Sequence, residues 1–284
     1  MEQVFEIKLC GEENGIGIEY VEENFLPTEN TGIQIYDQYK ISIMLTDGLL
    51  VVLDNIATRT EKGDFLVFRP DEIHFGKILD THIHKFLNIF IPINYFKNFS
   101  VDTKKITKFL EHRNQPNPIR QNPKNREKLL DATKPIIDAI NKGDFNTINL
   151  FSYILNILLL LADFYNNSEE SPIESDIPLC VAKTLNYISQ NFSGKITLKE
   201  LADNSYCSVA YLSKMFKQHM GCTVYEQLTN YRILNAKKLL RDGKTITEVS
   251  YECGFGDCSH FIKTFKHHTG ITPYYYKKNY KSIQ

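Results

Sequence analysis

Hydrophobic and polar positions alternate over short distances in the first third of the chain. Up to about residue 93, runs rich in Ile, Val, Leu and Phe are separated by turn-forming pairs such as Asp47-Gly48. Many short strands separated by turns are typical of an all-β sandwich or barrel, so we expect a β domain over about residues 1–95. The clearest strand-like runs cover residues 41–46, 49–54, 65–68 and 86–91.

A helical pattern replaces the strands at about residue 124. Residues 125–141 carry apolar side chains at helical spacing, and Pro135 is expected to bend or interrupt this helix. Residues 146–165 are apolar on nearly every side, which requires burial on several sides. The two helices would form an antiparallel hairpin over about residues 124–165. Its surplus apolar surface predicts either an intrachain core or, as we favour, the interface of a homodimer.

The stretch from residue 166 to residue 177 is polar, acidic and contains a proline, as is typical of a linker between domains. It separates an N-terminal domain, residues 1–165, from a C-terminal domain, residues 178–284. A chain of 284 residues is of the size expected for two domains. The predicted fold is therefore α+β, with a β domain and helical hairpin followed by an all-α domain.

Net charge changes sign between the two parts. Residues 178–284 hold 15 Lys and Arg against 7 Asp and Glu, whereas residues 1–177 hold 18 against 27. The overall net charge of −1 hides this asymmetry. Either charge simply varies between domains, or the basic part meets a polyanion that the acidic part repels.

The remaining composition indicates a cytoplasmic protein without a membrane segment. The hydrophobic content of 42% and the charged content of 24% are ordinary for a soluble chain. The N-terminus lacks a signal-peptide pattern, and the longest apolar run, residues 154–162, is too short to span a bilayer. The six cysteines form no Cys-x-x-Cys pair, so we expect reduced thiols and no zinc; a redox pair of Cys253 and Cys258 is the alternative.

The strongest signal is an internal repeat in the C-terminal part. A stretch that begins near Leu212 recurs 49 residues later, and slightly upstream the offset is 48 because the second copy has a longer turn. Repeats of this kind fix the architecture of a domain. The pairs matched at an offset of 49 include Leu212 and Phe261, Phe216 and Phe265, Lys217 and Lys266, Gly221 and Gly270, and Thr223 and Thr272.

Each copy of the repeat begins with a capping-box pattern, which satisfies free backbone amides at a helix start. A short helix, a tight turn and a longer, separately capped helix follow, and this order defines a helix-turn-helix. The capping boxes begin at Thr197 and Thr245, the short helices cover residues 198–204 and 246–253, and Ser208 and Asp257 cap the longer helices.

The longer helix of each copy has an inward and an outward face. Leu212 and Phe216, like Phe261 and Phe265, are spaced i, i+4 and point inward. The outward faces offer short polar side chains, lysines and a histidine, which suit a DNA major groove. Such lysines are either solvated or bound to DNA, and two equivalent faces in a basic domain favour DNA. The predicted contact residues are Ala210, Ser213, Lys214 and Lys217 in the first copy, and Ser259, His260, Lys263 and Lys266 in the second.

Residues 223–241 are predicted to form one long helix between the two copies. This helix would hold the two DNA-reading helices at a fixed separation. If they are parallel, they can enter successive major grooves about 34 Å apart. Arg232 and Lys237 lie on this helix and contact either phosphate or only solvent.

Residues 254–261 read Gly-Phe-Gly-Asp-Cys-Ser-His-Phe, and residues 270–274 read Gly-Ile-Thr-Pro-Tyr. These segments closely resemble the signature of AraC/XylS-type transcription regulators, and the first copy resembles that family's first unit. The resemblance covers about 105 residues from Leu179 onward and implies seven helices with two DNA-reading units. Lys277 stands near a position where many members carry an arginine, which leaves the charge unchanged.

Residues 63–74 read Gly-Asp-Phe-Leu-Val-Phe-Arg-Pro-Asp-Glu-Ile-His. They resemble the second conserved stretch of cupin-type β-barrels, which commonly form the sensor domain of such regulators. Cupin enzymes also carry a His-x-His and Glu set, but residues 35–40 contain no histidine. His82 and His84 could join His74, yet we expect no bound metal. The expected effector pocket is lined by Tyr36, Tyr39 and His74.

These patterns predict a sequence-specific DNA-binding transcription regulator with a cupin-like sensor barrel, not an enzyme. The expected partners are double-stranded promoter DNA, a small-molecule effector, a second copy bound through the helical hairpin and, for an activator, RNA polymerase. No cofactor is expected. The alternatives are a metal-dependent barrel enzyme with a nucleic-acid-tethering tail, which needs three or four metal ligands, and a protein-interaction module, which the basic faces disfavour.

Overall fold

The chain folds into two compact units. The N-terminal unit comprises Met1–Leu53 and Ala57–Asp176, and the C-terminal unit comprises Ile177–Gln284 with Asp54–Ile56. The predicted linker, residues 166–177, lies outside the described residues except at its two ends. The computed structural model describes residues 2–7, 15–24, 30–34, 36–53, 56–70, 72, 74–78, 82–99, 103–111, 119–144, 146–167 and 177–281.

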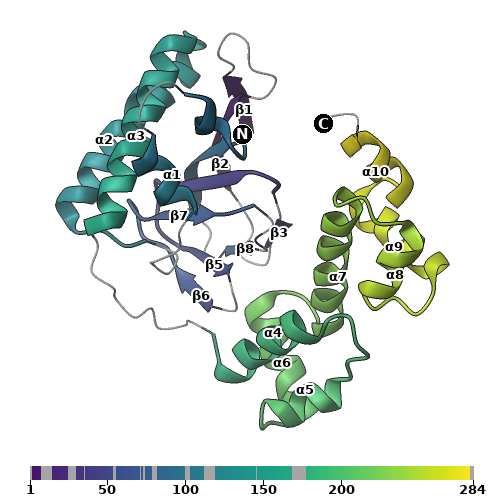
Figure 1. The fold of residues 1–284 in the computed structure, drawn as a ribbon. Helices are drawn as coiled ribbons and strands as arrows, with labels where there is room; N and C mark the ends of the chain where they lie inside the picture. The colour runs from purple at the N-terminus through teal and green to yellow at the C-terminus, as the bar shows by residue number, and fades with distance from the viewer. Residues whose placement is uncertain are drawn as a thin grey trace. The chain divides into compact units, whose positions relative to one another are not determined.

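Two β-sheets form the first part of the N-terminal unit (Figure 1). The larger sheet has the strand order β1-β2-β9-β4-β7 with antiparallel pairing throughout, and the smaller has the order β3-β8-β5-β6. Among the described strands the two sheets stay separate, so these residues do not form the closed barrel that we expected. The strands are β1 (Glu2–Ile7), β2 (Ile16–Asn24), β3 (Asn30–Gln34), β4 (Tyr39–Met44), β5 (Leu49–Leu53), β6 (Ile56–Arg59), β7 (Phe65–Phe68), β8 (His74–Ile78) and β9 (Ile83–Ile91).

Helices follow the strands. A 3₁₀ turn, η1 (Tyr95–Asn98), leads to the short helix α1 (Lys104–Glu111). The long helices α2 (Pro123–Lys142) and α3 (Thr147–Asn167) cover the two segments in which the sequence has helical periodicity. Gly143 ends α2 with a φ of 68°, a left-handed conformation that glycine adopts without steric cost.

The helix α2 runs through Pro135 without interruption, so the expected break does not occur, whereas a bend at this position stays a prediction. Proline removes one backbone hydrogen bond from a helix and normally costs about 3 kcal/mol. Here the next two turns carry Ile136 and Ile140, which are 0% and 5% exposed in the main core of the unit. Burial of these side chains offsets the lost hydrogen bond and keeps the helix continuous.

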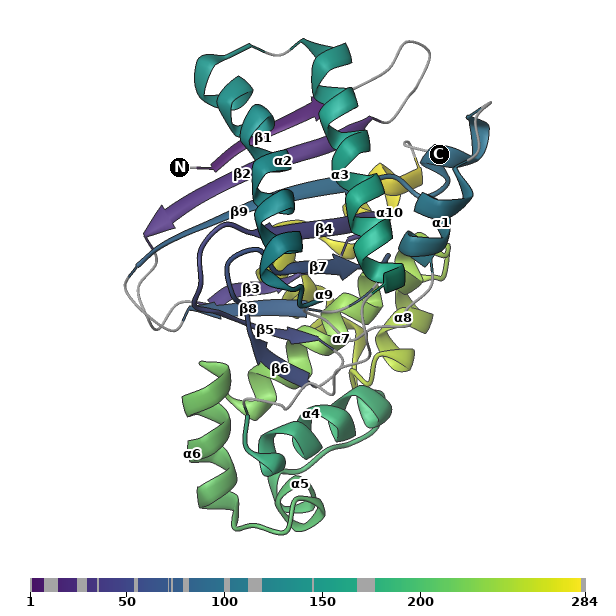
Figure 2. The ribbon, with the colours of Figure 1, turned by 90° about the vertical axis from the view of Figure 1, so that its left-hand side faces the viewer.

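Side-chain alternation on β7 sorts residues into two layers. Phe65 and Val67 face a core shared with α1, α2 and α3, whereas Leu66 and Phe68 pack with Val51 of the smaller sheet. All five side chains are buried. The unit is thus layered as helices, larger sheet and smaller sheet, and Figure 2 shows α2 and α3 crossing the larger sheet.

The helix α3 is the most apolar of the described helices. By length and composition its residues Thr147–Tyr165 would suffice to cross a membrane, and among the described residues no other helix meets that test. In the fold, α3 instead packs against α1, α2 and β1. Ile154, Ile157 and Leu161 are fully buried there. A core helix has the same composition, so intrachain packing accounts for much of its apolar character.

The C-terminal unit consists of helices arranged around the long helix α7 (Val224–Arg241) (Figure 1). Of the first three helices, the first and the third pack against α7, and the second packs against these two. The last three pack on its second half, where Ile233 and Leu240 share a core with Phe261 and Phe265. The other helices are α4 (Leu179–Asn191), α5 (Leu198–Asn204), α6 (Val209–Met220), α8 (Ile246–Glu252), α9 (Cys258–Thr269) and α10 (Pro273–Lys281).

Candidate nucleic-acid interface

Local caps fix where the helices of each repeat begin. The first helix-turn-helix comprises α5 and α6, and the second comprises α8 and α9. In all four helices a side chain at the predicted cap accepts a hydrogen bond from a backbone N–H of the first turn, which replaces a bond that the helix start lacks. These cap residues are Thr197, Ser208, Thr245 and Asp257.

The inward faces of α6 and α9 match the sequence prediction. Leu212 and Phe216 of α6 are 0% exposed, as are Phe261 and Phe265 of α9. The rings of Phe261 and Phe265 meet edge to face with centroids 5.6 Å apart. With these side chains buried, each helix can be oriented in only one way, and its opposite face must point to solvent.

The exposed faces of α6 and α9, which we call the recognition faces, contain no Asp or Glu. Lys214, Lys263 and Lys266 form no ion pair within the part of the chain that the structure describes. An uncompensated positive charge at an exposed helix face attracts phosphate. The exposed side chains are Val209, Ala210, Tyr211, Lys214, Lys217 and Gln218 on α6, and Ser259, His260, Lys263, Lys266, His267 and His268 on α9.

Ser213 is the one predicted contact residue that is not fully exposed. Its equivalent in α9, Ile262, is half-buried in the same way. Tyr211, which the sequence prediction omitted, has 50% of its surface exposed and is the equivalent of His260. The offset of 49 residues applied to His260 would have identified it. Tyr211 is therefore a further outward residue near the start of α6, and contact between Ser213 and DNA stays a prediction.

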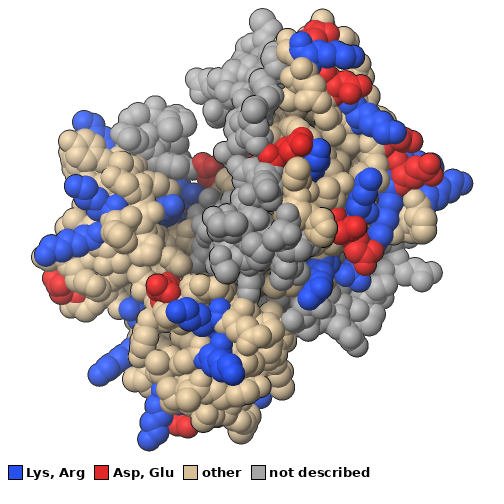
Figure 3. All heavy atoms as spheres, turned by 180° about the vertical axis from the view of Figure 1, so that it is seen from behind, with Lys and Arg blue, Asp and Glu red and all other residues tan. Residues whose placement is uncertain are grey.

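Positive charge also dominates beyond the recognition faces. Figure 3 shows one side of the C-terminal unit, on which lysines and arginines outnumber the acidic side chains visible between them. On α7, Lys237 is half-buried, and burial lowers its pKa. Burial also lowers the pKa of His268 on α9, and the nearby His267 and Lys237 lower it further. Contact between Lys237 and phosphate stays a prediction.

Arg232 makes contacts within the chain that neither of the two alternatives, phosphate or solvent, anticipated. Its Nε donates to the carbonyl oxygen of Phe192 at 2.8 Å, and its Nη2 donates to the carbonyl oxygen of Gly194 at 2.7 Å. The side chain is half-buried, and this burial lowers its pKa. The guanidinium is therefore engaged with the chain's own backbone.

The residues expected to line an effector pocket are divided between the two sides of the larger sheet. Tyr36 and His74 are together, with ring centroids 5.7 Å apart, and His74 stacks on Phe68 at 3.7 Å. Burial lowers the pKa of His74 to about 3, so its ring is neutral. Tyr39 instead lines a small hollow with Tyr95 on the helix-facing side. Neighbouring residues of a strand point to opposite faces, and Lys40, next to Tyr39 on β4, lies 4.9 Å from the Tyr36 ring centroid, so Tyr39 points away from Tyr36.

Around His74, two polar residues bridge neighbouring strands of the larger sheet. Ser42 donates to the Asn88 side chain at 2.6 Å, and Asn88 donates in turn to Glu19. The Nε2 atom of His74 is buried without a hydrogen-bond partner among the described residues. Side chains that could accept or donate to a small molecule are thus present between the two sheets.

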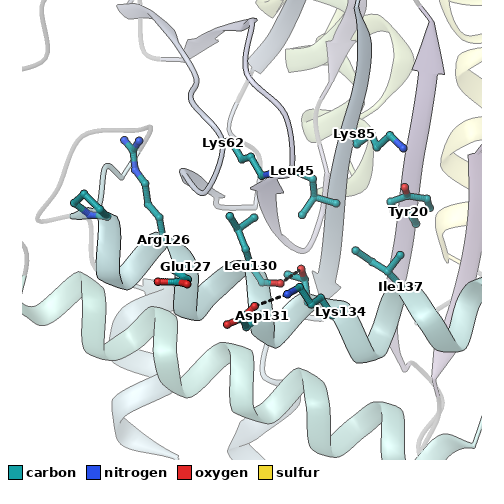
Figure 4. A pocket seen from close by; sticks show the side chains of 12 residues that line it. Tyr20, Leu45, Lys62, Lys85, Arg126, Glu127, Leu130, Asp131, Lys134 and Ile137 are labelled. Atoms are coloured by element: carbon teal, nitrogen blue, oxygen red, sulfur yellow. Dashed lines mark hydrogen bonds and ion pairs between the residues drawn. The ribbon is translucent and has the colours of Figure 1, made fainter.

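A larger hollow of about 620 Å³ lies between the larger sheet and α2 (Figure 4). Three of its four cations are paired with carboxylates: among them, Lys134 lies 2.6 Å from Asp131, and Lys85 lies 2.8 Å from Glu22. Arg126, on its rim, lies 3.0 Å from the buried Asp64. The fourth cation of the lining, Lys62, forms no ion pair among the described residues, so the carboxylates compensate three of the four positive charges.

The described residues contain no group of three His, Cys, Asp or Glu side chains that could hold a metal ion. His74 and His84 are buried, whereas His82 is exposed. Cys253 is buried in the core beside Phe261, and burial raises its pKa to about 12, which makes its thiol unreactive. The pair of Cys253 and Cys258 thus gains no support as a redox switch.

Comparison with known proteins adds to this geometry. Residues 201–279 match the model of a family described as a helix-turn-helix domain. The HTH-type transcriptional activator RhaS of Enterobacter sp. (strain 638) is 25% identical over 142 residues, which is 49% of this chain and 51% of that protein. RhaS of Salmonella schwarzengrund is 32% identical over 80 residues, or 28% and 29% of the two chains. The chain thus spans about half or less of the curated relatives that it matches.

Among solved structures, the C-terminal domain of AraT, a response regulator from Geobacillus stearothermophilus, is 30% identical with a TM-score of 0.36. The match covers 37% of this chain and 88% of that one. The family match contains both recognition helices, whose caps, buried faces and exposed lysines are those of a groove-reading helix-turn-helix. Residues 201–279 are therefore a helix-turn-helix domain.

Proposed function

We propose that the whole chain is a sequence-specific DNA-binding transcription regulator in which α6 and α9 each read one major groove. One observation carries this proposal: two structurally equivalent helices expose faces without any acidic side chain, each with two lysines. The names of the relatives support a regulatory rather than an enzymatic role. A cytoplasmic location fits this role.

Residues near the start of each recognition helix would reach the base edges. Tyr211 and His260 offer hydrogen-bonding groups there, and Lys214 and Lys263 follow one turn later. A lysine amine can donate to guanine O6 and N7, whereas nearby lysines that miss the bases bind phosphate. Neighbouring phosphates would therefore position the helices, and these four residues would discriminate sequence.

The test is binding to promoter DNA by electrophoretic mobility shift with specific and scrambled competitors. Lys214→Ala and Lys263→Ala should each weaken specific binding by about 1–3 kcal/mol, or roughly 5-fold to 150-fold. Lys142→Ala, which removes an exposed lysine at the end of α2 in the other unit, is the matched control and should bind as the wild type does. Wild-type affinity in both recognition-face variants would overturn the assignment.

The N-terminal unit is proposed to be a cupin-like sensor for a small-molecule effector. Support comes from Tyr36 and His74, which lie together, and from the polar residues between the two sheets. Native mass spectrometry of the purified full chain would test for a bound small molecule. A molecule retained by the wild type and lost in His74→Leu supports a site here, and retention by both proteins argues against it.

We also propose that the helical hairpin mediates a homodimer. Ile148 and Leu159 of α3 are 77% and 46% exposed, which leaves apolar surface uncovered within one chain. Sedimentation velocity of the Ile148→Asp, Leu159→Asp double variant should show a monomer where the wild type is a dimer. If binding increases transcription, RNA polymerase is a further partner.

A further inference from the structure

The two helix-turn-helix units touch each other directly, in addition to their connection through α7. The contact is made by the loop after α4, residues 192–194, and we count α4 and this loop with the first unit because α4 packs against α5 and α6. Arg232, in the middle of α7, holds this loop by donating to the carbonyl oxygens of Phe192 and Gly194. The planar guanidinium thus engages the two acceptors in a fixed fork geometry, which the single ammonium group of a lysine does not reproduce.

The turn of the second unit lies against the same loop. Gly254 has a φ of 74°, and a Cβ atom placed on it would lie 2.6 Å from the carbonyl oxygen of Ser193 and 2.8 Å from that of Phe192. No side chain fits in that space. The equivalent residue of the first unit, Tyr206, also has a positive φ, 54°, but its side chain is 87% exposed. Glycine is therefore required in the second unit by close packing, not by backbone conformation alone.

Aromatic rings complete the junction. The guanidinium of Arg232 lies 5.9 Å from the ring centroid of Phe255, the residue that follows Gly254. Phe255 itself is 3% exposed and belongs to the core of the second unit. On the other side, the ring of Phe192 lies 5.3 Å from that of Tyr231. Arg232 therefore contacts the first unit through hydrogen bonds and the second through a ring.

We propose that Arg232 and Gly254 form a clamp that fixes the mutual orientation of the two helix-turn-helix units and thereby sets the one half-site spacing that the protein accepts on DNA. This inference rests on the proposed DNA-binding function. A single helix such as α7 fixes the distance between two units but allows each to tilt about its ends. Contacts beside the helix axis remove that freedom, so both recognition faces meet DNA in one geometry.

The test compares DNA fragments that differ only in the spacer between the two half-sites. Each added base pair turns the second half-site by roughly 35° and moves it by about 3.4 Å. Wild-type affinity should fall about tenfold or more when two base pairs are inserted. In Arg232→Lys and Arg232→Ala the same insertion should lower the DNA-binding affinity by less than about threefold, because each unit can reorient.

Two controls separate the clamp from other effects. Lys238→Ala removes an exposed charge from the same helix without touching residues 192–194 and should keep the wild-type spacing profile. Binding to a fragment with one half-site should be equal in wild type and Arg232→Lys. A wild-type spacing profile in both Arg232 variants would overturn the clamp.

Hydrogen exchange in the absence of DNA gives a readout that does not depend on the proposed function. In Arg232→Lys, amides of residues 192–196 and 254–255 should exchange faster than in the wild type, and in Lys238→Ala they should not. Unchanged exchange in Arg232→Lys would refute the contact itself. Faster exchange combined with no specific DNA binding by the wild type would instead overturn the proposed function, and with it the role of the clamp in half-site spacing.

Discussion

Tyr211 and His260 occupy equivalent places on α6 and α9, each on the third residue after its helix cap and each exposed to solvent. Their different side chains sit on otherwise similar faces, with lysines at matching positions. The two helices should therefore prefer different bases while binding phosphate alike. This difference gives the paired site a direction along the DNA.

We expect Tyr211→Ala and His260→Ala to alter sequence preference at different half-sites. Each loss of a base contact should cost about 1–3 kcal/mol at the affected base pairs and little elsewhere. Binding of the two variants to a library of randomised half-sites would measure this. If both variants changed the base preference at the same half-site, the proposal that each helix reads its own groove would be contradicted.

Salt dependence should report the phosphate contacts separately. The logarithm of affinity should fall linearly with the logarithm of salt concentration, and removing one phosphate-bound lysine should reduce the slope by about 1. Lys217→Ala and Lys266→Ala, which lie one turn beyond the base-reading positions, are expected to show this reduction. Titrations between 50 and 200 mM salt would measure it, and unchanged slopes would exclude phosphate contact at these lysines.

Much of the C-terminal unit could be predicted because its signals are local. Thr197, Ser208, Thr245 and Asp257 cap helices within three residues of themselves, and i, i+4 spacing identified the buried faces. Arg232 could not be assigned in this way. Its partners lie 38 and 40 residues earlier, and only the folded unit brings them together.

In the N-terminal unit, strand-like patterns predicted the sheets but not their pairing. The separation of Tyr39 from His74 follows from the alternation of side chains along β4. To predict this separation from the sequence, one would have to know the residue at which β4 begins. Pro135 shows the opposite case: a strong local signal for a helix break was overridden by burial of Ile136 and Ile140. Tertiary packing decided each of these points.

Gly254→Ala should destabilise the C-terminal unit more than Gly243→Ala does. Both glycines have positive φ, 74° and 89°, but a Cβ at 243 meets nothing within 4 Å. Backbone strain alone should lower the free energy of unfolding by about 1 kcal/mol in Gly243→Ala. In Gly254→Ala the added clash should raise this loss of unfolding free energy to about 3 kcal/mol. Denaturant unfolding of the full chain would measure both, and equal losses would show that the Ser193 contact is unimportant.

The stability of the N-terminal unit should depend on Asp64. This carboxyl is 0% exposed, and burial raises its pKa to about 6 despite a hydrogen bond from the Glu61 N–H and the nearby Arg126. Because the folded pKa exceeds that of an unfolded aspartate, about 3.9, its contribution to stability is full below that pH and is lost as pH rises through about 6.

Asp64→Asn removes this titration. Between pH 4.5 and 7 the wild type should therefore lose more unfolding free energy than the variant does, as measured by denaturant unfolding at a series of pH values. The same pH dependence in both proteins would mean that Asp64 does not titrate in this range.

Hydroxyl-radical footprinting of the full chain on promoter DNA tests most directly whether two equivalent surfaces each enter one groove. We predict protection of two segments on one face of the duplex, about one helical turn apart, with Lys214→Ala weakening one segment and Lys263→Ala the other. A single protected segment, or loss of both segments from either substitution alone, would contradict two independent reading helices.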